Sequence, residues 1–156
     1  MIEFKPGHCI VTKLSKQQIL DFAEEMQQAD KDSIKKLVGW SPIEGLAHSL
    51  FNSHEIVAWT VNDKVAAVFG ISGAADSRCA WCLCSDLIQD YPSVFLRFSK
   101  TLLRLSVDKY GTPIQNLVDA DHTASIRWLQ WLGYDVYENQ VKGIKGDPFH
   151  LNILRA

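Results

Sequence analysis

The chain has 156 residues, of which 47% are hydrophobic, and its formal net charge is −2 at pH 7. This length predicts one domain with a single core, and so small a charge creates no general field for polyanions, so no nucleic-acid partner is predicted. No apolar run approaches the ~20 residues of a membrane span, and the run Met1–Pro6 lacks the parts of a signal peptide, so we expect a soluble, intracellular protein without a membrane contact.

Three helices are predicted in the N-terminal third, after a short strand at Cys9–Thr12. Ser15 suits the N-cap of the first helix, which is expected to run to about Gln28. Asp30 or Asp32 is expected to cap a second, short helix. Gly39 is expected to end the second helix. A third helix is expected to begin at Ser41-Pro42. Its apolar stripe consists of Ile43, Leu46, Ala47 and Leu50.

The periodicity then changes from helical to extended. Ile56–Val61 and Val65–Ile71 predict a hairpin, because Asn62-Asp63 between them tolerates the positive φ of a tight turn. A further strand is predicted at Cys79–Ser85.

Three of the four cysteines lie in that last strand and suggest a metal signature at first sight. In a strand, however, Cys82 and Cys84 share one face while Cys79 points to the other. A closed zinc site needs four convergent ligands. The pattern therefore favours reduced cysteines acting as small buried hydrophobes, and no metal.

A long helix is predicted from Pro92 to Tyr110, ended by Gly111, with an apolar face of Val94, Phe95, Phe98, Leu102 and Leu105. A strand at Ile114–Val118 follows, then a helix with Asp121 or Thr123 as its cap. Gly133 is expected to end this helix, and two further strands are predicted at Tyr134–Tyr137 and Pro148–Leu154. This order, β-ααα-β-β-β-α-β-α-β-β, predicts an α+β domain with a mixed, mainly antiparallel sheet flanked by helices.

The segment Thr112–Tyr137 resembles the closing strand–helix–strand of the acyl-CoA N-acyltransferase (GNAT) superfamily. The resemblance lies in Leu117-Val118, then the run 122–126, then Trp128 to Tyr134, which are similar to the "V…N..A..lYek.GF" signature. It is closer to a small GNAT-like family of tailed phages that includes an internal virion protein of short-tailed coliphages. The short sequence segments shared with that branch include Val68-Phe69-Gly70, Pro92-Ser93-Val94-Phe95, Asn116 to Ala120, and Pro148-Phe149-His150.

The resemblance implies a GNAT-like fold over the whole chain, with acetyl-CoA or CoA as the cofactor. It places backbone groups of Leu83, Cys84 and Ser85 beside the pantetheine amide, and Gln89 and Ser93 beside the diphosphate. In an enzyme of this family, His122 or Asp119 would take a proton from an amine. The residues alone leave other interpretations open, since His122 also suits the surface of a helix start and Asp119 also suits a cap.

Two departures from the family pattern concern chemistry. The family's glycine-rich pyrophosphate loop corresponds here to 86–93, which has no glycine, carries Asp86 and Asp90, and loses one N–H donor at Pro92. Each carboxylate beside a diphosphate costs about 1 kcal/mol even in high dielectric. The tyrosine that commonly protonates the CoA thiolate is replaced by Leu129, and the family's asparagine by His122.

Two functions remain open on these grounds. The first is a phage-encoded, acyl-CoA-dependent N-acetyltransferase acting on a small-molecule or protein amine in the host bacterial cytoplasm. The second is a catalytically degenerate GNAT fold that serves in virion morphogenesis or binds other phage proteins, in the host cytoplasm or the virion. The loop 86–93 discriminates between them, because free N–H groups converging on an open pocket favour the first, and a cleft filled by Leu87, Ile88 or Tyr91 favours the second.

Overall fold

A computed structural model of the chain describes residues 5–155, so most of the N-terminal run used above to argue against a signal peptide lies outside the described residues. The strands are β1 (His8–Val11), β2 (Ser53–Val61), β3 (Lys64–Ser72), β4 (Cys79–Cys84), β5 (Ile114–Asp119), β6 (Asp135–Lys142) and β7 (Pro148–Leu154). The helices are α1 (Lys16–Glu25), α2 (Gln28–Val38), α3 (Pro42–Asn52), the short 3-10 helix η1 (Asp86–Asp90), α4 (Pro92–Tyr110) and α5 (Thr123–Leu132). The predicted order of elements is confirmed, with η1 as an addition.

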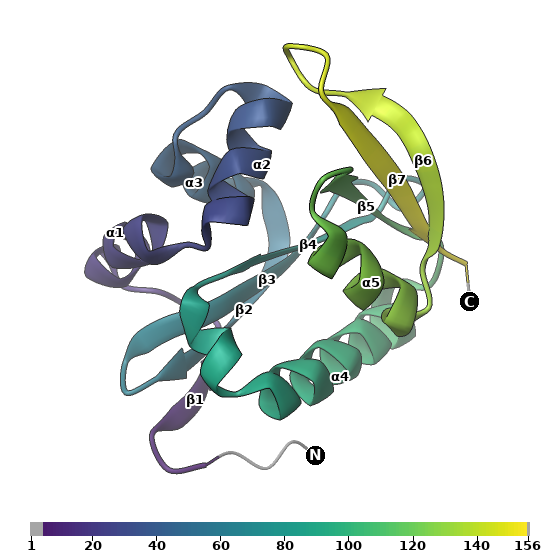
Figure 1. The fold of residues 1–156 in the computed structure, drawn as a ribbon. Coiled ribbons are helices and arrows are strands. Elements are labelled where there is room, and N and C mark those ends of the chain that lie inside the picture. The colour runs from purple at the N-terminus through teal and green to yellow at the C-terminus, as the bar shows by residue number, and fades with distance from the viewer. Residues whose placement is uncertain (1–4, 156) are drawn as a thin grey trace.

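The strands form a seven-stranded sheet in the order β1-β2-β3-β4-β5-β7-β6 (Figure 1). Neighbouring strands are antiparallel except β4 and β5, which are parallel. These two strands are paired at a single position, Cys79 with Gln115, whereas β5 and β7 are paired at six. The sheet is therefore mixed and mainly antiparallel, as predicted, and it opens in the middle between β4 and β5.

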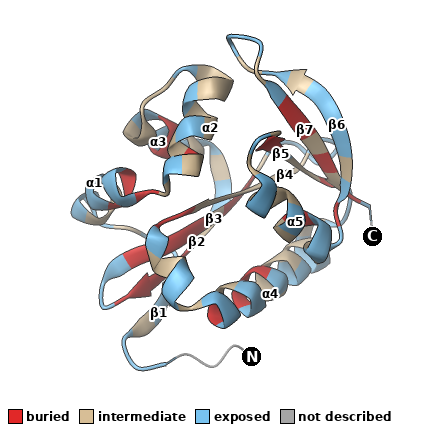
Figure 2. Cartoon of the chain, viewed as in Figure 1, coloured by how far each residue is buried: buried red, intermediate tan, exposed pale blue. Residues whose placement is uncertain are grey.

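Helices cover both faces of the sheet, and burial is concentrated along β2, β3 and the inward faces of the helices (Figure 2). Helices α1 and α3 pack on one face around Phe22, Leu46 and Val68. On the other face α4 and η1 pack around Trp59 and Phe98. A third cluster joins α4 and α5 to the C-terminal strands, with its members at Ile114, Val118, Leu129, Tyr134 and Leu154.

Several local signals have the predicted effect. Ser15 and Ser41 each cap their helix in a capping box, in which the side chain accepts from the N3 backbone N–H. Gly39 ends α2 at φ 75°, in the left-handed region that glycine adopts readily. Asn62 and Asp63 have φ values of 49° and 67°, as the hairpin turn requires.

Five local predictions are wrong, one of them being Ala47, which was expected on the apolar stripe of α3 and is exposed. The first helix ends at Glu25, because Met26 leaves the helix to form a bridge with Ser85. Neither Asp30 nor Asp32 caps α2, whose N-cap is Gln27 without a side-chain bond. The N-cap of α5 is His122 rather than Asp121 or Thr123, and Leu105 is 54% exposed instead of lying on the buried face of α4.

Cys82 and Cys84 share a face of β4, as predicted, with their sulfur atoms 3.5 Å apart. All four cysteines are free thiols. Within residues 5–155, no group of three or more His, Cys, Asp or Glu side chains is arranged to hold a metal ion. No helix in the same range is long and apolar enough to cross a membrane.

Candidate functional site

The opening between β4 and β5 leaves one edge of each strand without a neighbouring strand. On β4 this edge carries the backbone groups of Ala80, Cys82 and Cys84, since alternate residues of a strand direct their N–H and C=O to the same side. The amide of Asn116 on β5 closes the narrow end by donating to the Ala80 carbonyl at 2.6 Å. Beyond that bond the two edges diverge toward their carboxyl ends.

The wide end of this edge is occupied by the chain itself. The Gln27 N–H donates to the Cys84 carbonyl at 2.8 Å, and the Cys84 N–H donates to Asp30 Oδ2 at 2.9 Å. Both backbone groups of Cys84 are therefore bound by the junction between α1 and α2. Ser85 is engaged as well, because its N–H donates to Ala66 O at 2.9 Å and its hydroxyl to Val65 O at 3.1 Å.

Asp30 is 9% exposed and lies in the first turn of α2, as the third residue of the helix and not as its N-cap. Burial raises the pKa of its carboxyl to about 6, against a smaller lowering by the hydrogen bond from Cys84. Among the described residues no cation forms an ion pair with this carboxylate. Its fixed partner is a single backbone N–H, which offsets only part of the desolvation of a charge.

Part of the connection after β4 is hydrogen-bonded internally, while α4 begins at Pro92 with no side chain capping its first N–H groups. The N–H groups of Leu87 and Ile88 donate to the hydroxyl and the carbonyl of Ser85, and that of Tyr91 donates to Ile88 O. Leu87, Ile88 and Tyr91 pack against the core under α4 and do not line either cavity described below. Gln89 and Ser93, which the resemblance places beside a diphosphate, are exposed.

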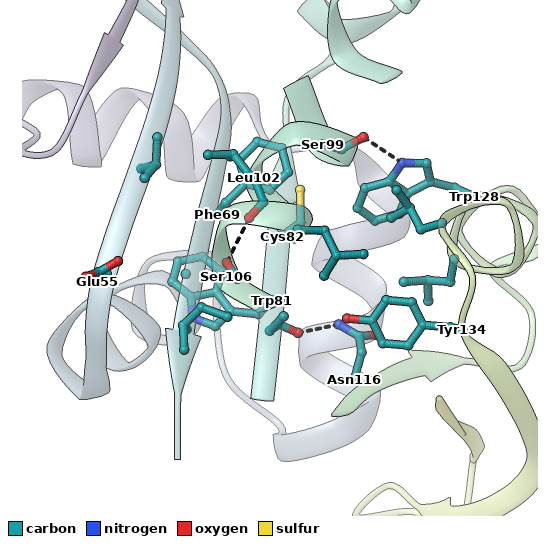
Figure 3. A pocket seen from close by; sticks show the side chains of 17 residues that line it. Glu55, Phe69, Trp81, Cys82, Ser99, Leu102, Ser106, Asn116, Trp128 and Tyr134 are labelled. Atoms are coloured by element: carbon teal, nitrogen blue, oxygen red, sulfur yellow. Dashed lines mark hydrogen bonds between the residues drawn. The ribbon is translucent and has the colours of Figure 1, made fainter. Parts of the chain in front are cut away.

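Helices α4 and α5 are joined by aromatic contact over the sheet. The rings of Phe95 and Trp128 lie 5.3 Å apart. The Trp128 indole N–H also donates to Ser99 Oγ at 3.1 Å (Figure 3). A cavity of about 80 Å³ remains beneath this contact, with Tyr134 and Asn116 on its wall. The packing thus links the two helices directly and leaves only a small space between them and the sheet.

A second cavity, of about 170 Å³, lies between α2, the carboxyl ends of β4 and β5, and the start of α5. His122 and Asp119 both line it, so the structure brings together the two side chains that the sequence singled out. His122 Nε2 lies 3.2 Å from Ser125 Oγ. Burial lowers the pKa of His122, and the nearby Asp119 carboxylate opposes this shift.

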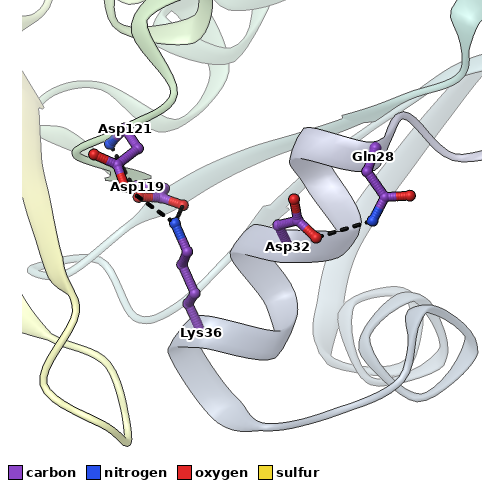
Figure 4. A network of polar contacts seen from close by, with 5 residues as sticks. All are labelled: Gln28, Asp32, Lys36, Asp119 and Asp121. Atoms are coloured by element: carbon purple, nitrogen blue, oxygen red, sulfur yellow. Dashed lines mark hydrogen bonds and ion pairs between the residues drawn. The ribbon is translucent and has the colours of Figure 1, made fainter.

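Asp119 is tied to α2 by Lys36, whose Nζ lies 2.9 Å from Asp119 Oδ2 and 3.2 Å from Asp121 Oδ2 (Figure 4). The Asp119 side chain is 6% exposed, so its charge is held by the ammonium group and by the Asp121 N–H at 3.0 Å. The hydrogen bond that Lys36 donates to Asp119 raises the pKa of Lys36. As placed here, Asp119 is an ion-pair partner and has no free oxygen aimed at a substrate amine.

The sequence did not single out Asp30, Lys36 or Asn116 as site residues. Asp30 was interpreted as a helix cap, and Lys36 lies among the alternating charges of a short helix. Their partners are 54, 83 and 36 residues away along the chain, so no local pattern marks them. For Asn116 the one available signal was its place on a strand at the edge of the opening.

Comparison with solved structures identifies the fold. No protein-family model and no curated protein matches the sequence significantly. Solved structures match it over nearly its whole length. The ribosomal-protein-S18-alanine N-acetyltransferase from Escherichia coli superposes with a TM-score of 0.64 at 14% identity, covering 94% of this chain and 92% of that one.

Two further structures agree. The ribosomal-protein-S5-alanine acetyltransferase from Vibrio fischeri gives a TM-score of 0.66 at 11% identity, covering 97% of this chain and 93% of its own. A ribosomal L7/L12 α-N-protein acetyltransferase in complex with coenzyme A gives 0.62 at 8% identity, covering 97% and 96%. The chain therefore has the fold of the GNAT acetyltransferases, and at these identities the likeness concerns the fold alone.

Coenzyme A does not fit the residues present in this arrangement. The β4 groups expected to pair with pantetheine at Cys84 are bound by Gln27 and Asp30. The following loop carries Asp86 and Asp90, and the N–H groups of Leu87, Ile88 and Tyr91 are bonded within the loop. Binding would require both the release of Cys84 and the approach of a highly charged anion to two carboxylates.

Proposed function

We propose that this protein is a GNAT-fold binding protein without acyl-transfer turnover. The observation that carries the proposal is the double engagement of Cys84, whose N–H and C=O are taken by Asp30 and Gln27. A GNAT enzyme needs this edge for its cofactor, so a chain that binds Cys84 with its own groups retains the architecture and loses the donor site.

The loop 86–93 supports the same proposal, since it carries two carboxylates and no glycine. The resemblance to the tailed-phage family points to other phage proteins as partners. It also points to the host bacterial cytoplasm or the virion as the location. Virion morphogenesis is the role that such partners imply.

Calorimetry with CoA and acetyl-CoA tests the loss of the donor site. We expect no binding heat at ligand concentrations up to about 1 mM, which corresponds to binding weaker than about −4 kcal/mol. A GNAT acetyltransferase titrated under the same conditions is the positive control. Micromolar binding of either ligand overturns the proposal.

The binding role has a separate test in an infected culture of a phage that encodes the chain. Mass spectrometry of purified virions and of assembly intermediates should detect the protein in stable complexes with other phage proteins. If it is found only as a free monomer in infected cells, the morphogenesis role is wrong.

One observation favours a second candidate, an N-acetyltransferase acting on a small-molecule or protein amine. His122 and Asp119 line a cavity at the carboxyl ends of the two diverging strands, where His122 could accept a proton from an amine while Asp119 is held by Lys36. This candidate requires α2 to move away from Cys84 first. Incubation with radiolabelled acetyl-CoA and an amine panel tests it, and label transfer that is lost in His122→Ala supports it.

A further inference from the structure

The outer surface of α4 and α5 carries positive charge that no acidic residue of these helices balances. Arg97, Lys100 and Arg104 follow one side of α4 at spacings of three and four residues, and all three are exposed. Arg127 on α5 is exposed as well. Helix α4 has no Asp or Glu before Asp108, and α5 has none. Among residues 5–155 none of these four cations has an ion-pair partner.

Exposed apolar side chains lie among these cations. Trp131 is 48% exposed and lies one helical turn after Arg127. The Lys100 ammonium lies 5.1 Å from the centre of the Trp131 ring, so the exposed sides of the two helices are continuous. Leu96, which is 39% exposed, lies on α4 one turn before Lys100. The basic face consists of Leu96, Arg97, Lys100, Arg104, Arg127 and Trp131.

The outer side of α1 has the opposite charge. Asp21, Glu24 and Glu25 are exposed, and within residues 5–155 no Lys, Arg or His forms an ion pair with them. The neighbouring Lys31 donates to the backbone carbonyl of Glu24. Leu20, which is 42% exposed, lies one turn before Glu24. The acidic face consists of Leu20, Asp21, Glu24 and Glu25.

The two faces match in spacing but lie on opposite sides of the molecule. Asp21 and Glu24 are three residues apart, which corresponds to a rise of about 4.5 Å along α1. Arg97 and Lys100 have the same spacing on α4. Helix α1 packs on one side of the sheet and α4 on the other (Figure 1), so a contact between the two faces requires a second copy of the chain.

A nucleic acid matches the basic face less well than an acidic protein surface does. The chain has a net charge of −2, so it has no long-range attraction for a polyanion. The Lys100 ammonium lies over the Trp131 ring, so a base cannot stack on that side of it. A short acidic surface with an apolar group fits the basic face, and the chain itself provides such a surface on α1.

We propose that the chain associates head to tail, with the acidic face of one copy on the basic face of the next. Carboxylates of α1 lie against the cations of α4, and Leu20 packs beside Leu96 and Trp131. A dimer keeps one unused face at each end, so this heterologous contact builds rings or open chains. The inference goes beyond the proposed function and does not depend on it, because neither face includes Cys84 or the open edge of β4.

Sedimentation velocity on the full chain tests the association. Exposed ion pairs contribute little each, so we expect a weak contact with a Kd of about 100 µM at about 50 mM NaCl. The average mass should rise with protein concentration and return to the monomer value at about 1 M NaCl, where the Debye length is about 3 Å. A mass that stays monomeric up to about 1 mM protein overturns the proposal.

Neutral substitutions separate the two faces. The basic-face variant combines Arg97→Gln and Arg104→Gln. The acidic-face variant combines Asp21→Asn and Glu25→Gln. Each should weaken self-association at least about tenfold, because two ion pairs are lost. Their 1:1 mixture should form a dimer and nothing larger, because only one complementary pair of faces remains intact.

Lys64→Gln with Lys145→Gln is the matched control. Both lysines are exposed, lie outside the two faces and have no ion-pair partner among residues 5–155. This control changes the net charge by the same amount as the basic-face variant, and it should associate like the parent. Equal weakening in the control would show a general effect of charge and overturn the proposal.

The mixture decides between these faces and any other contact. If both double variants, with circular dichroism spectra like that of the parent, associate as the parent does, or if their mixture stays monomeric, the assignment of the faces is wrong. The CoA titration is read separately, because binding of CoA removes the proposed function and leaves the head-to-tail contact to its own result.

Discussion

The Asp30 carboxylate accepts a hydrogen bond from the Cys84 backbone N–H at 2.9 Å and so fixes α2 to the open edge of β4. With the Gln27 N–H on the Cys84 carbonyl, this contact replaces the strand neighbour that Cys84 lacks. The backbone N–H and C=O of Cys84 at the open edge of β4 are therefore hydrogen-bonded within the chain. This arrangement buries the charge of the Asp30 carboxylate. The consequences of that burial can be measured.

Asp30→Asn is expected to change how stability depends on pH. In the native state the Asp30 pKa is raised from 3.8 to about 6, so the folded protein binds this proton more tightly than the unfolded chain. Its contribution is therefore fully favourable below pH 3.8 and is lost as pH rises through about 6, a change of about 3 kcal/mol. Urea unfolding should show Asp30→Asn gaining stability relative to the parent between pH 4 and pH 7.5, by about 2–3 kcal/mol.

The same titration on Asp32→Asn provides the control, since this exposed carboxylate accepts only from Gln28. Groups elsewhere in the chain titrate equally in parent and variant and cancel in the difference. A difference between Asp30→Asn and the parent that stays constant with pH would show that Asp30 is not desolvated as described.

Lys36→Met tests the link between α2 and β5. It leaves the Asp119 carboxylate, 6% exposed, without its cation, while the apolar stem of the side chain is preserved. The pair is half-buried, so the expected loss lies between the values for surface and buried pairs, at roughly 1–3 kcal/mol in the free energy of unfolding. Lys35→Met, at an exposed neighbouring position, should change stability by less than about 0.5 kcal/mol.

A double variant separates the ion pair from other effects. Adding Asp119→Asn to Lys36→Met should cost less than the single changes together, because the uncompensated charge is removed. Strict additivity of the two changes would mean that the 2.9 Å contact contributes nothing to stability.

Much of the fold follows from local sequence, while the contacts of the site do not. Ser15, Ser41 and Gly39 act through their immediate neighbours, and their roles were predicted correctly. Asp30 has the same local pattern as a helix cap, yet in the first turn of α2 its carboxylate binds the N–H of Cys84 from a distant strand. A capping residue and a buried anchor cannot be told apart until the tertiary fold places the partner.

His122 and Asp119 show the same difference between what the local sequence predicts and what tertiary contacts decide. The order of elements was enough to place His122 and Asp119 at the end of β5, and they do line one cavity. The sequence could not show that Lys36 would engage Asp119, since 83 residues separate them. It is this pairing that determines whether Asp119 is free to act as a base.

His122 is predicted to titrate below the ordinary histidine value of 6.5. Burial lowers its pKa, while the Asp119 carboxylate partly raises it again. Asp119→Asn should therefore lower the pKa further, and NMR titration of the ring protons measures both values. Because the folded pKa is below the unfolded one, the contribution of His122 to stability decreases as pH falls through about 6.5. A pKa above 6.5 in the parent, or a rise in Asp119→Asn, would contradict this account.

Gly70→Ala is expected to disturb the floor of both cavities. A Cβ added at Gly70 would overlap the indole ring of Trp81, which lies directly across from it on β4 and is held by a 2.7 Å bond from its N–H to Ser53 Oγ. The overlap forces the ring to move, and overpacking of this kind costs typically about 1–3 kcal/mol. Urea unfolding measures the loss. In a Trp81→Leu background the same glycine substitution should cost less, since the smaller side chain leaves room for the Cβ. An unchanged cost in that background would place the strain in the backbone of β3 rather than in the contact between Gly70 and Trp81.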